Sequence, residues 1–105
     1  MKPPMGIFII RSKVNNKCYI EETQDLKGKM NSARAKLSAG LHPNQELQKE
    51  WADFGPENFT IEILAHLEYD KDEAKTDYKE ELALLRMIWE EKLANEGVEF
   101  FKKRI

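Results

Sequence analysis

The period of the apolar residues changes several times along the chain, and the first stretch predicts a β-hairpin. Apolar and mostly β-branched residues from Met5 to Arg11 predict a strand. The Asn15-Asn16 pair is typical of a tight turn, because asparagine tolerates a positive φ. The apolar stretch from Cys18 to Ile20 then predicts the returning strand.

The period next becomes helical, which predicts a helix from about Asp25 to Ser38. Asp25 is suited to cap its start, and Gly40 is suited to end it. Gly28 costs roughly 1 kcal/mol relative to alanine inside a helix, so a start one turn later is an alternative. The apolar positions that set this helical spacing are Leu26, Met30, Ala33 and Leu37.

A second helix and a third strand follow. The helix is predicted from about Asn44 to Phe54, because Leu47 and Trp51 lie one turn apart and Gly55-Pro56 ends the run. The alternation from Phe59 to Leu67 predicts a half-buried strand, since successive side chains of a strand point to opposite faces. The residues expected on its buried face are Phe59, Ile61 and Ile63.

The last long helix is predicted from about Asp77 to Glu96, after a charged loop. The segment from Phe100 to Arg104 is too short to classify. The order β-β-α-α-β-α predicts an α+β fold, with a small three-stranded antiparallel sheet flanked by helices. A chain of 105 residues is expected to form a single domain over residues 1–105. The apolar face of the last helix comprises Tyr78, Leu82, Leu85, Trp89 and Leu93.

The net charge of -2 hides a difference between the two halves of the chain. Residues 1–49 carry nine Lys and Arg against four Asp and Glu, whereas residues 50–105 carry eight against fifteen. The basic half could meet phosphates while the acidic half faces away, or the two halves are simply two differently solvated surfaces. The pI near 5.7 and the absence of an Arg-rich stretch argue against tight non-specific binding to nucleic acid.

Two features of the sequence bear on the compartment. The apolar stretch near the start, Ile7 to Ile10, is far shorter than a signal-peptide core or a membrane span. The single cysteine, Cys18, cannot form an internal disulfide, which fits a reducing compartment. We therefore expect a cytoplasmic protein without a membrane partner.

Several short motifs together resemble the GIY-YIG nuclease domain family. Gly6-Ile7-Phe8 resembles the GIY motif, and Tyr19-Ile20-Glu21 resembles the YIG motif at the usual spacing. The connector Gly40-Leu41-His42-Pro43-Asn44 is similar to the "G-x-H-x-N" connector of the family. The resemblance covers roughly residues 5 to 93 and implies the family's fold. Further matches occur in the family's order at Leu47-Gln48, Trp51, Gly55, Phe59 and Ile63-Leu64.

The resemblance also implies positions for the catalytic groups. The two signature tyrosines of the family, which handle the attacking water and the phosphate, fall on Phe8 and Tyr19. Phe8 lacks the hydroxyl that proton transfer needs. The family's helix arginine falls on Lys29, which keeps the charge but loses the planar fork. The family's connector histidine falls on His42, and a histidine position of the first helix falls on Ala33. Tyr19, Lys29 and His42 are therefore the expected remnants of a catalytic site.

The metal ligand of the family is expected to be missing. The apolar spacing of the last helix places Arg86 where the family has a metal-binding glutamate, and a cation there repels a metal ion. Glu81 and Glu90 are expected on the wrong side to replace it. We therefore expect no cofactor, with Mg²⁺ or Mn²⁺ required only if activity survives. Glu21 replaces the glycine of YIG and either points into the site, where it would repel a phosphate, or out into solvent.

Three functions fit these observations. The first is a GIY-YIG-like domain without nuclease activity that still binds DNA or RNA. The second is a protein-interaction or oligomerisation domain, such as a homodimer. The third is a weakly active, metal-dependent endonuclease. The residues expected to contact nucleic acid in the first case are Lys27, Lys29, Arg34, Lys36 and Arg86, together with Tyr19 and His42.

Overall fold

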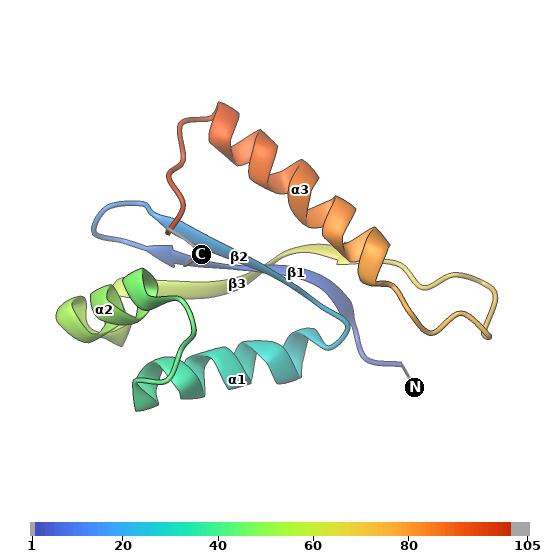
Figure 1. The fold of residues 1–105 in the computed structure, drawn as a ribbon, viewed down its shortest axis with the longest axis horizontal. Helices are drawn as coiled ribbons and strands as arrows, with labels where there is room; N and C mark the ends of the chain where they lie inside the picture. Colours follow the sequence, from blue (N-terminus) through green and yellow to red (C-terminus); the bar gives the residue numbers. More distant parts are fainter. Residues whose placement is uncertain (1, 102–105) are drawn as a thin grey trace.

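The computed structural model describes residues 2–101, which form a three-stranded antiparallel sheet with helices on both faces (Figure 1). The strands are β1 (Met5–Ser12), β2 (Cys18–Thr23) and β3 (Phe59–Leu67). Their order in the sheet is β2-β1-β3, so the first strand lies in the middle. The predicted α+β fold and the predicted antiparallel sheet are confirmed.

The central strand β1 is apolar on both faces because both faces are covered. Phe8 and Ile10 pack against α1 (Leu26–Ala39) and α2 (Gln45–Phe54). Ile7 and Ile9 point the other way and belong to the core beneath α3 (Lys79–Asn95). A strand that is buried on both faces needs a continuous apolar run, which explains why β1 does not alternate. In Figure 1, α3 lies on one side of the sheet and α1 and α2 lie on the other.

Each of the first two helices begins at a side-chain cap. Asp25 accepts a hydrogen bond from the backbone N–H of Gly28, so α1 begins at Leu26 rather than one turn later. The alternative start raised by Gly28 is therefore wrong. Asn44 caps α2 in the same way, by accepting from the backbone N–H of Leu47 at 3.0 Å. The Asn44 cap fixes where the connector between α1 and α2 ends, and the left-handed Gly40 fixes where it begins.

Strand β3 contains an irregularity that changes which residues it buries. Ile7 pairs with Ala65 but Phe8 pairs with Ile63, so Leu64 is an extra residue in the ladder, as in a β-bulge. Leu64 and Ala65 consequently pack on the α3 side of the sheet. Ile63, which the alternation placed on the buried face, is 43% exposed, and that expectation is wrong.

The segment after α3 returns to the sheet. Phe100 forms a parallel bridge with Cys18 on β2, and the adjacent Phe101 is buried. The rest of the segment that the sequence left unclassified, residues 102–104, lies outside the described residues. A short 3₁₀ helix, η1 (Pro56–Asn58), precedes β3. Within residues 2–101, no helix is long and apolar enough to cross a membrane.

Candidate functional site

A cavity of about 230 Å³ lies between β2, α1 and the connector that follows α1. It brings together the three expected remnants of a catalytic site, Tyr19, Lys29 and His42, and one further expected cation, Lys36. These residues are up to 23 positions apart in sequence, so it is the fold that brings the expected residues into one cavity. The complete lining is Tyr19, Glu21, Lys29, Ser32, Ala33, Lys36, His42 and Pro43.

Glu21 points into this cavity and binds two of its donors. Tyr19 and Glu21 share a face of β2 because they lie two residues apart. The Tyr19 hydroxyl donates to Glu21 Oε1 at 2.9 Å, and the Lys29 ammonium lies 3.2 Å from Glu21 Oε2. Of the two orientations that the sequence left open, the carboxylate therefore takes the inward one, and it neutralises the lysine at the family's arginine position.

The Tyr19 phenol is held in its protonated form. Burial raises its pKa well above the ordinary value, and the charge and hydrogen bond of Glu21 raise it further. The positive charge of Arg86 opposes this shift with a smaller effect. At neutral pH the phenol is therefore a hydrogen-bond donor, and it is poorly suited to accept a proton from an attacking water.

His42 is a second neutral donor in the lining. His42 is 7% exposed, and its ring lies edge-on to the Tyr19 ring, with 5.1 Å between the centroids. Nδ1 accepts from the backbone N–H of Asn44 at 3.0 Å, which assigns the proton of the neutral ring to Nε2. Burial lowers the pKa of His42, and the charges of Lys36 and Lys29 act in the same direction, while the charge of Glu21 and the hydrogen bond with Asn44 oppose part of this shift. The imidazole is therefore neutral and keeps an Nε2–H donor at neutral pH.

Phe8 lies in the core and is not among the residues that line the cavity. Its ring is fully buried among the residues that β1, α1 and α2 contribute to that core. Phe8 thus serves as a packing residue of the core, and it has no hydroxyl to offer the cavity. Lys27 and Arg34 are exposed on α1 and are also absent from the lining.

Arg86, which the resemblance was expected to place at the family's metal-ligand position, is bound by two carboxylates. Its Nε donates to Glu22 Oε1 at 2.6 Å and its Nη1 donates to Glu90 Oε1 at 2.9 Å. These contacts raise the pKa of Arg86 despite its partial burial. Glu22 follows Glu21 on β2 and points to the opposite face of the sheet. The expectation that Glu90 lies on the wrong side is incorrect, because residues four apart share a helix face.

These residues do not fit a divalent metal ion. A cation placed between Glu22 and Glu90 would have to displace the Arg86 guanidinium, which both carboxylates bind. Across residues 2–101, no three His, Cys, Asp or Glu side chains come together as a group that could hold a metal. We therefore assign no chemical step to a metal here.

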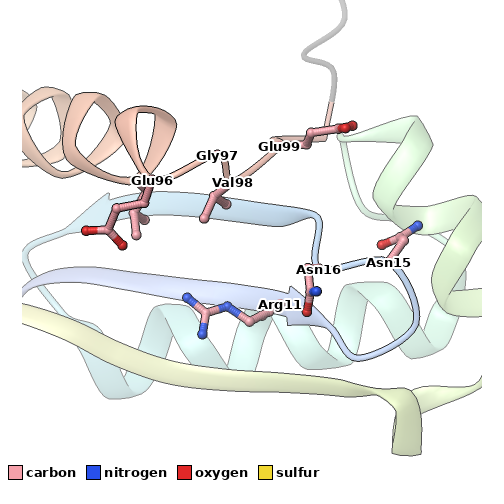
Figure 2. A pocket seen from close by; sticks show the side chains of 8 residues that line it. Arg11, Asn15, Asn16, Glu96, Gly97, Val98 and Glu99 are labelled. Atoms are coloured by element: carbon pink, nitrogen blue, oxygen red, sulfur yellow. The ribbon is translucent and has the colours of Figure 1, made fainter.

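A second cavity, of about 450 Å³, lies near the hairpin turn and the end of α3. Figure 2 shows Arg11 and the amides of Asn15 and Asn16 beside the segment that carries Glu96 and Glu99. No motif in the sequence indicates this cavity, because its residues belong to no shared pattern and meet only through the fold. Its lining mixes one guanidinium with two carboxylates and two amides, so its charge favours no ligand class.

The comparisons with known proteins concern the fold. No family model and no curated protein matches the chain. The solved catalytic domain of the homing endonuclease I-TevI does match, with a TM-score of 0.71 and 22% identity over 94% of this chain and 99% of that chain. The catalytic domain of a glutamate-to-alanine mutant of the intron endonuclease I-TevI matches with a TM-score of 0.69 and 23% identity, over 91% of this chain and 90% of that chain. I-TevI is a GIY-YIG homing endonuclease, so the chain has a GIY-YIG-like fold.

Proposed function

We propose that this protein is a GIY-YIG-like domain that binds the phosphate backbone of nucleic acid without cleaving it. The observation that carries the proposal is the lining of the cavity between β2 and α1. Tyr19, Lys29, Lys36 and His42 supply two ammonium groups and two neutral donors within one concave site. Phosphate oxygens are acceptors that such donors bind well. The likeness of the fold to an endonuclease domain supports nucleic acid as the source of the phosphate.

The cations of α1 divide into two groups, and only one group faces the cavity. Lys29 and Lys36 are seven residues apart and both line the cavity. Lys27 and Arg34 are also seven apart, but a displacement of two residues turns them roughly 200° around the helix. They therefore emerge on the other flank of the buried stripe. We assign the contact to Lys29 and Lys36, and we use Lys27 as an internal control.

Three side chains count against cleavage. Phe8 has no hydroxyl, the Tyr19 phenol holds its proton, and Arg86 occupies the metal-ligand position. Removing one preorganised group from an active site costs about 10²–10³ in rate, so a combined change leaves little of the original chemistry. The domain keeps donors that bind a phosphate but lacks the groups that would activate water.

The first experiment measures binding by fluorescence anisotropy, with a labelled DNA duplex and a labelled RNA of the same sequence at low ionic strength. Lys36→Glu should weaken binding about ten-fold, because it reverses a charge in the cavity. Lys27→Glu makes the same change on the other flank and should alter the affinity much less. Equal losses in the two variants would mean that the cavity is not the contact surface.

A nicking assay separates binding from the surviving-endonuclease alternative. Supercoiled plasmid should stay intact with the wild-type protein in Mg²⁺ or in Mn²⁺. Metal-dependent nicking that disappears in Tyr19→Phe would contradict the non-cleaving assignment. It would establish a weak endonuclease instead.

Self-association is a second candidate function, and one observation favours it. The outer face of α3 exposes Leu84, Met87 and Ile88 by 59%, 56% and 61%, at the spacing of a helical stripe. A second copy of the chain could cover this stripe. Sedimentation at several protein concentrations tests it, because the average mass should rise with concentration for the wild type and not for Met87→Lys.

A further inference from the structure

We infer that Glu21 is an internal competitor for the phosphate, held in the position that a phosphate oxygen pair would take. This inference rests on the proposed function, and it identifies Glu21 as the residue that limits the affinity of the cavity for a phosphate. Both oxygens of the carboxylate are engaged, one by the Tyr19 hydroxyl and one by the Lys29 ammonium. A bound phosphodiester presents the same two acceptors to the same donors. The carboxylate and the phosphate therefore compete for one set of contacts.

The lining of the cavity is otherwise built from donors. Lys29, Lys36 and the hydroxyls of Tyr19 and Ser32 can all donate, and His42 donates through Nε2. Among the described residues that line it, Glu21 is the only carboxylate. The internal anion thus satisfies a site whose other groups are suited to an anion.

The charge of Glu21 acts in two ways against an incoming phosphate. It cancels the charge of Lys29, which at 3.2 Å forms a direct ion pair with it. It would also repel a phosphate placed a few ångströms away, because like charges this close interact strongly in a partly buried site. Within residues 2–101 Lys36 forms no ion pair, so its charge is available for a first contact with a phosphate.

Glu21 can leave the cavity without disturbing the fold. Its side chain is 20% exposed and stands on β2, an edge strand of the sheet. Rotation about the side chain would move the carboxylate toward solvent, while the β2 backbone stays paired with β1. Position 21 also falls where the resemblance to the YIG motif has a glycine, a residue with no side chain to compete. The competitor is thus a feature of this chain.

The test compares Glu21→Gln with Glu62→Gln in the anisotropy assay. Both variants remove one negative charge, but Glu62 is exposed on β3, the opposite edge strand, and pairs with Ile9, whose side chain lies in the α3 core. Glu21→Gln keeps an oxygen that can accept from Tyr19. We expect it to raise the affinity for the DNA duplex about ten-fold, the effect of one freed charge-assisted contact. Glu62→Gln should change the affinity by less than about two-fold, because solvent and salt screen an exposed charge on the opposite edge of the sheet from the cavity.

The dependence on salt gives a second readout. One additional phosphate contact should steepen the slope of log affinity against log salt by about 0.9 in Glu21→Gln. In a Lys29→Gln background the same substitution should give a clearly smaller gain, because the Lys29 contact is absent and only the direct repulsion is relieved. An equal gain with and without Lys29 would overturn the inference, because it would show that only net charge matters.

The outcomes separate this inference from the proposed function. In one outcome the wild type binds, Lys36→Glu weakens binding, and Glu21→Gln has the same affinity as Glu62→Gln. The cavity then binds nucleic acid, and the role of Glu21 as a competitor is refuted. If Glu21→Gln alone binds, the competitor stands, and binding by the wild type is refuted. If none of these proteins binds, both are refuted.

A measurement on the wild type avoids reliance on a variant that folds poorly. The ¹³C resonance of the Glu21 carboxyl should shift when the DNA duplex is added, because the hydrogen bond from Tyr19 is lost. Inorganic phosphate is the second arm. A shift with the duplex at a much lower concentration than with phosphate supports recognition of nucleic acid, and an unchanged Glu21 resonance at saturating duplex overturns the inference.

Discussion

Arg86 joins α3 to β2, and replacing it should measurably destabilise the fold. Arg86→Gln removes the guanidinium that bonds Glu22 at 2.6 Å and Glu90 at 2.9 Å. The variant keeps a polar side chain of moderate length, so its main effect is to leave the two carboxylates without their shared cation. The loss therefore reports how much the Arg86 contacts with Glu22 and Glu90 contribute to stability.

The magnitude follows from the burial of the three side chains, which are 22%, 25% and 28% exposed for Arg86, Glu22 and Glu90. A fully exposed ion pair contributes about 0–1 kcal/mol. Breaking a buried pair costs about 3–5 kcal/mol, because a charge is left unpaired. For this intermediate burial we expect a loss of about 2 kcal/mol, which lowers Tm by roughly 10 °C in a domain of this size.

Urea unfolding followed by circular dichroism gives the free energy directly, and a thermal scan gives Tm. Arg86→Lys keeps the charge without the fork and should lose about half as much. Lys79→Gln is the matched control, because it removes an exposed cation from the first turn of the same helix and should change stability by less than about 0.5 kcal/mol. If Arg86→Gln and Lys79→Gln unfolded at the same urea concentration, this reasoning would be refuted.

The remaining predictions concern the fold and pH. Gly6→Ala should prevent folding or cost at least about 3 kcal/mol, because the added Cβ would lie 2.0 Å from the Ala65 carbonyl oxygen, and soluble expression with circular dichroism checks this. Gly28→Ala should leave the free energy of unfolding nearly unchanged, because a gain in helix propensity of about 1 kcal/mol is offset by displacement of the Asp25 cap. In an Asp25→Ala background the cap is already absent, so the same substitution should stabilise the fold by about that amount in urea unfolding. Burial lowers the pKa of His42 below its ordinary 6.5, so the unfolded state takes up the proton first and stability falls as pH drops through that value. The fall in unfolding free energy from about pH 7 to about pH 5 should be smaller in His42→Asn, and an equal fall would count against a neutral buried imidazole.

The fold could be predicted from the sequence where the signals are local. The Asp25 cap, the helix that begins at about Asn44 and the alternation that opens β3 each depend on a few neighbouring residues, and the observed boundaries agree with the predicted ones within a few positions. The bulge at Leu64 escaped prediction, because it depends on the register of β3 against β1. The return of Phe100 to β2 escaped for the same reason, since it pairs segments that are 82 positions apart.

The candidate site could be predicted only in part. Tyr19, Lys29 and His42 meet as the resemblance implied, because the fold that carries them is itself a GIY-YIG-like fold. The inward orientation of Glu21 could not be derived, since the sequence allowed both faces. The contact of Arg86 with Glu22 joins residues 64 apart, and no periodicity in the sequence relates an edge strand to the last helix.

The two phenylalanines after α3 lock the layers of the molecule to each other. Phe100 inserts into the core under α3, while Phe101 inserts into the core on the α1 and α2 side. Two backbone hydrogen bonds hold this segment to Cys18. The Cys18 N–H donates to the Glu99 carbonyl, and the Phe101 N–H donates to the Cys18 carbonyl. Cys18 is followed directly by Tyr19, which lines the cavity, so a pull on this segment would act on the β2 backbone one residue away from the phenol.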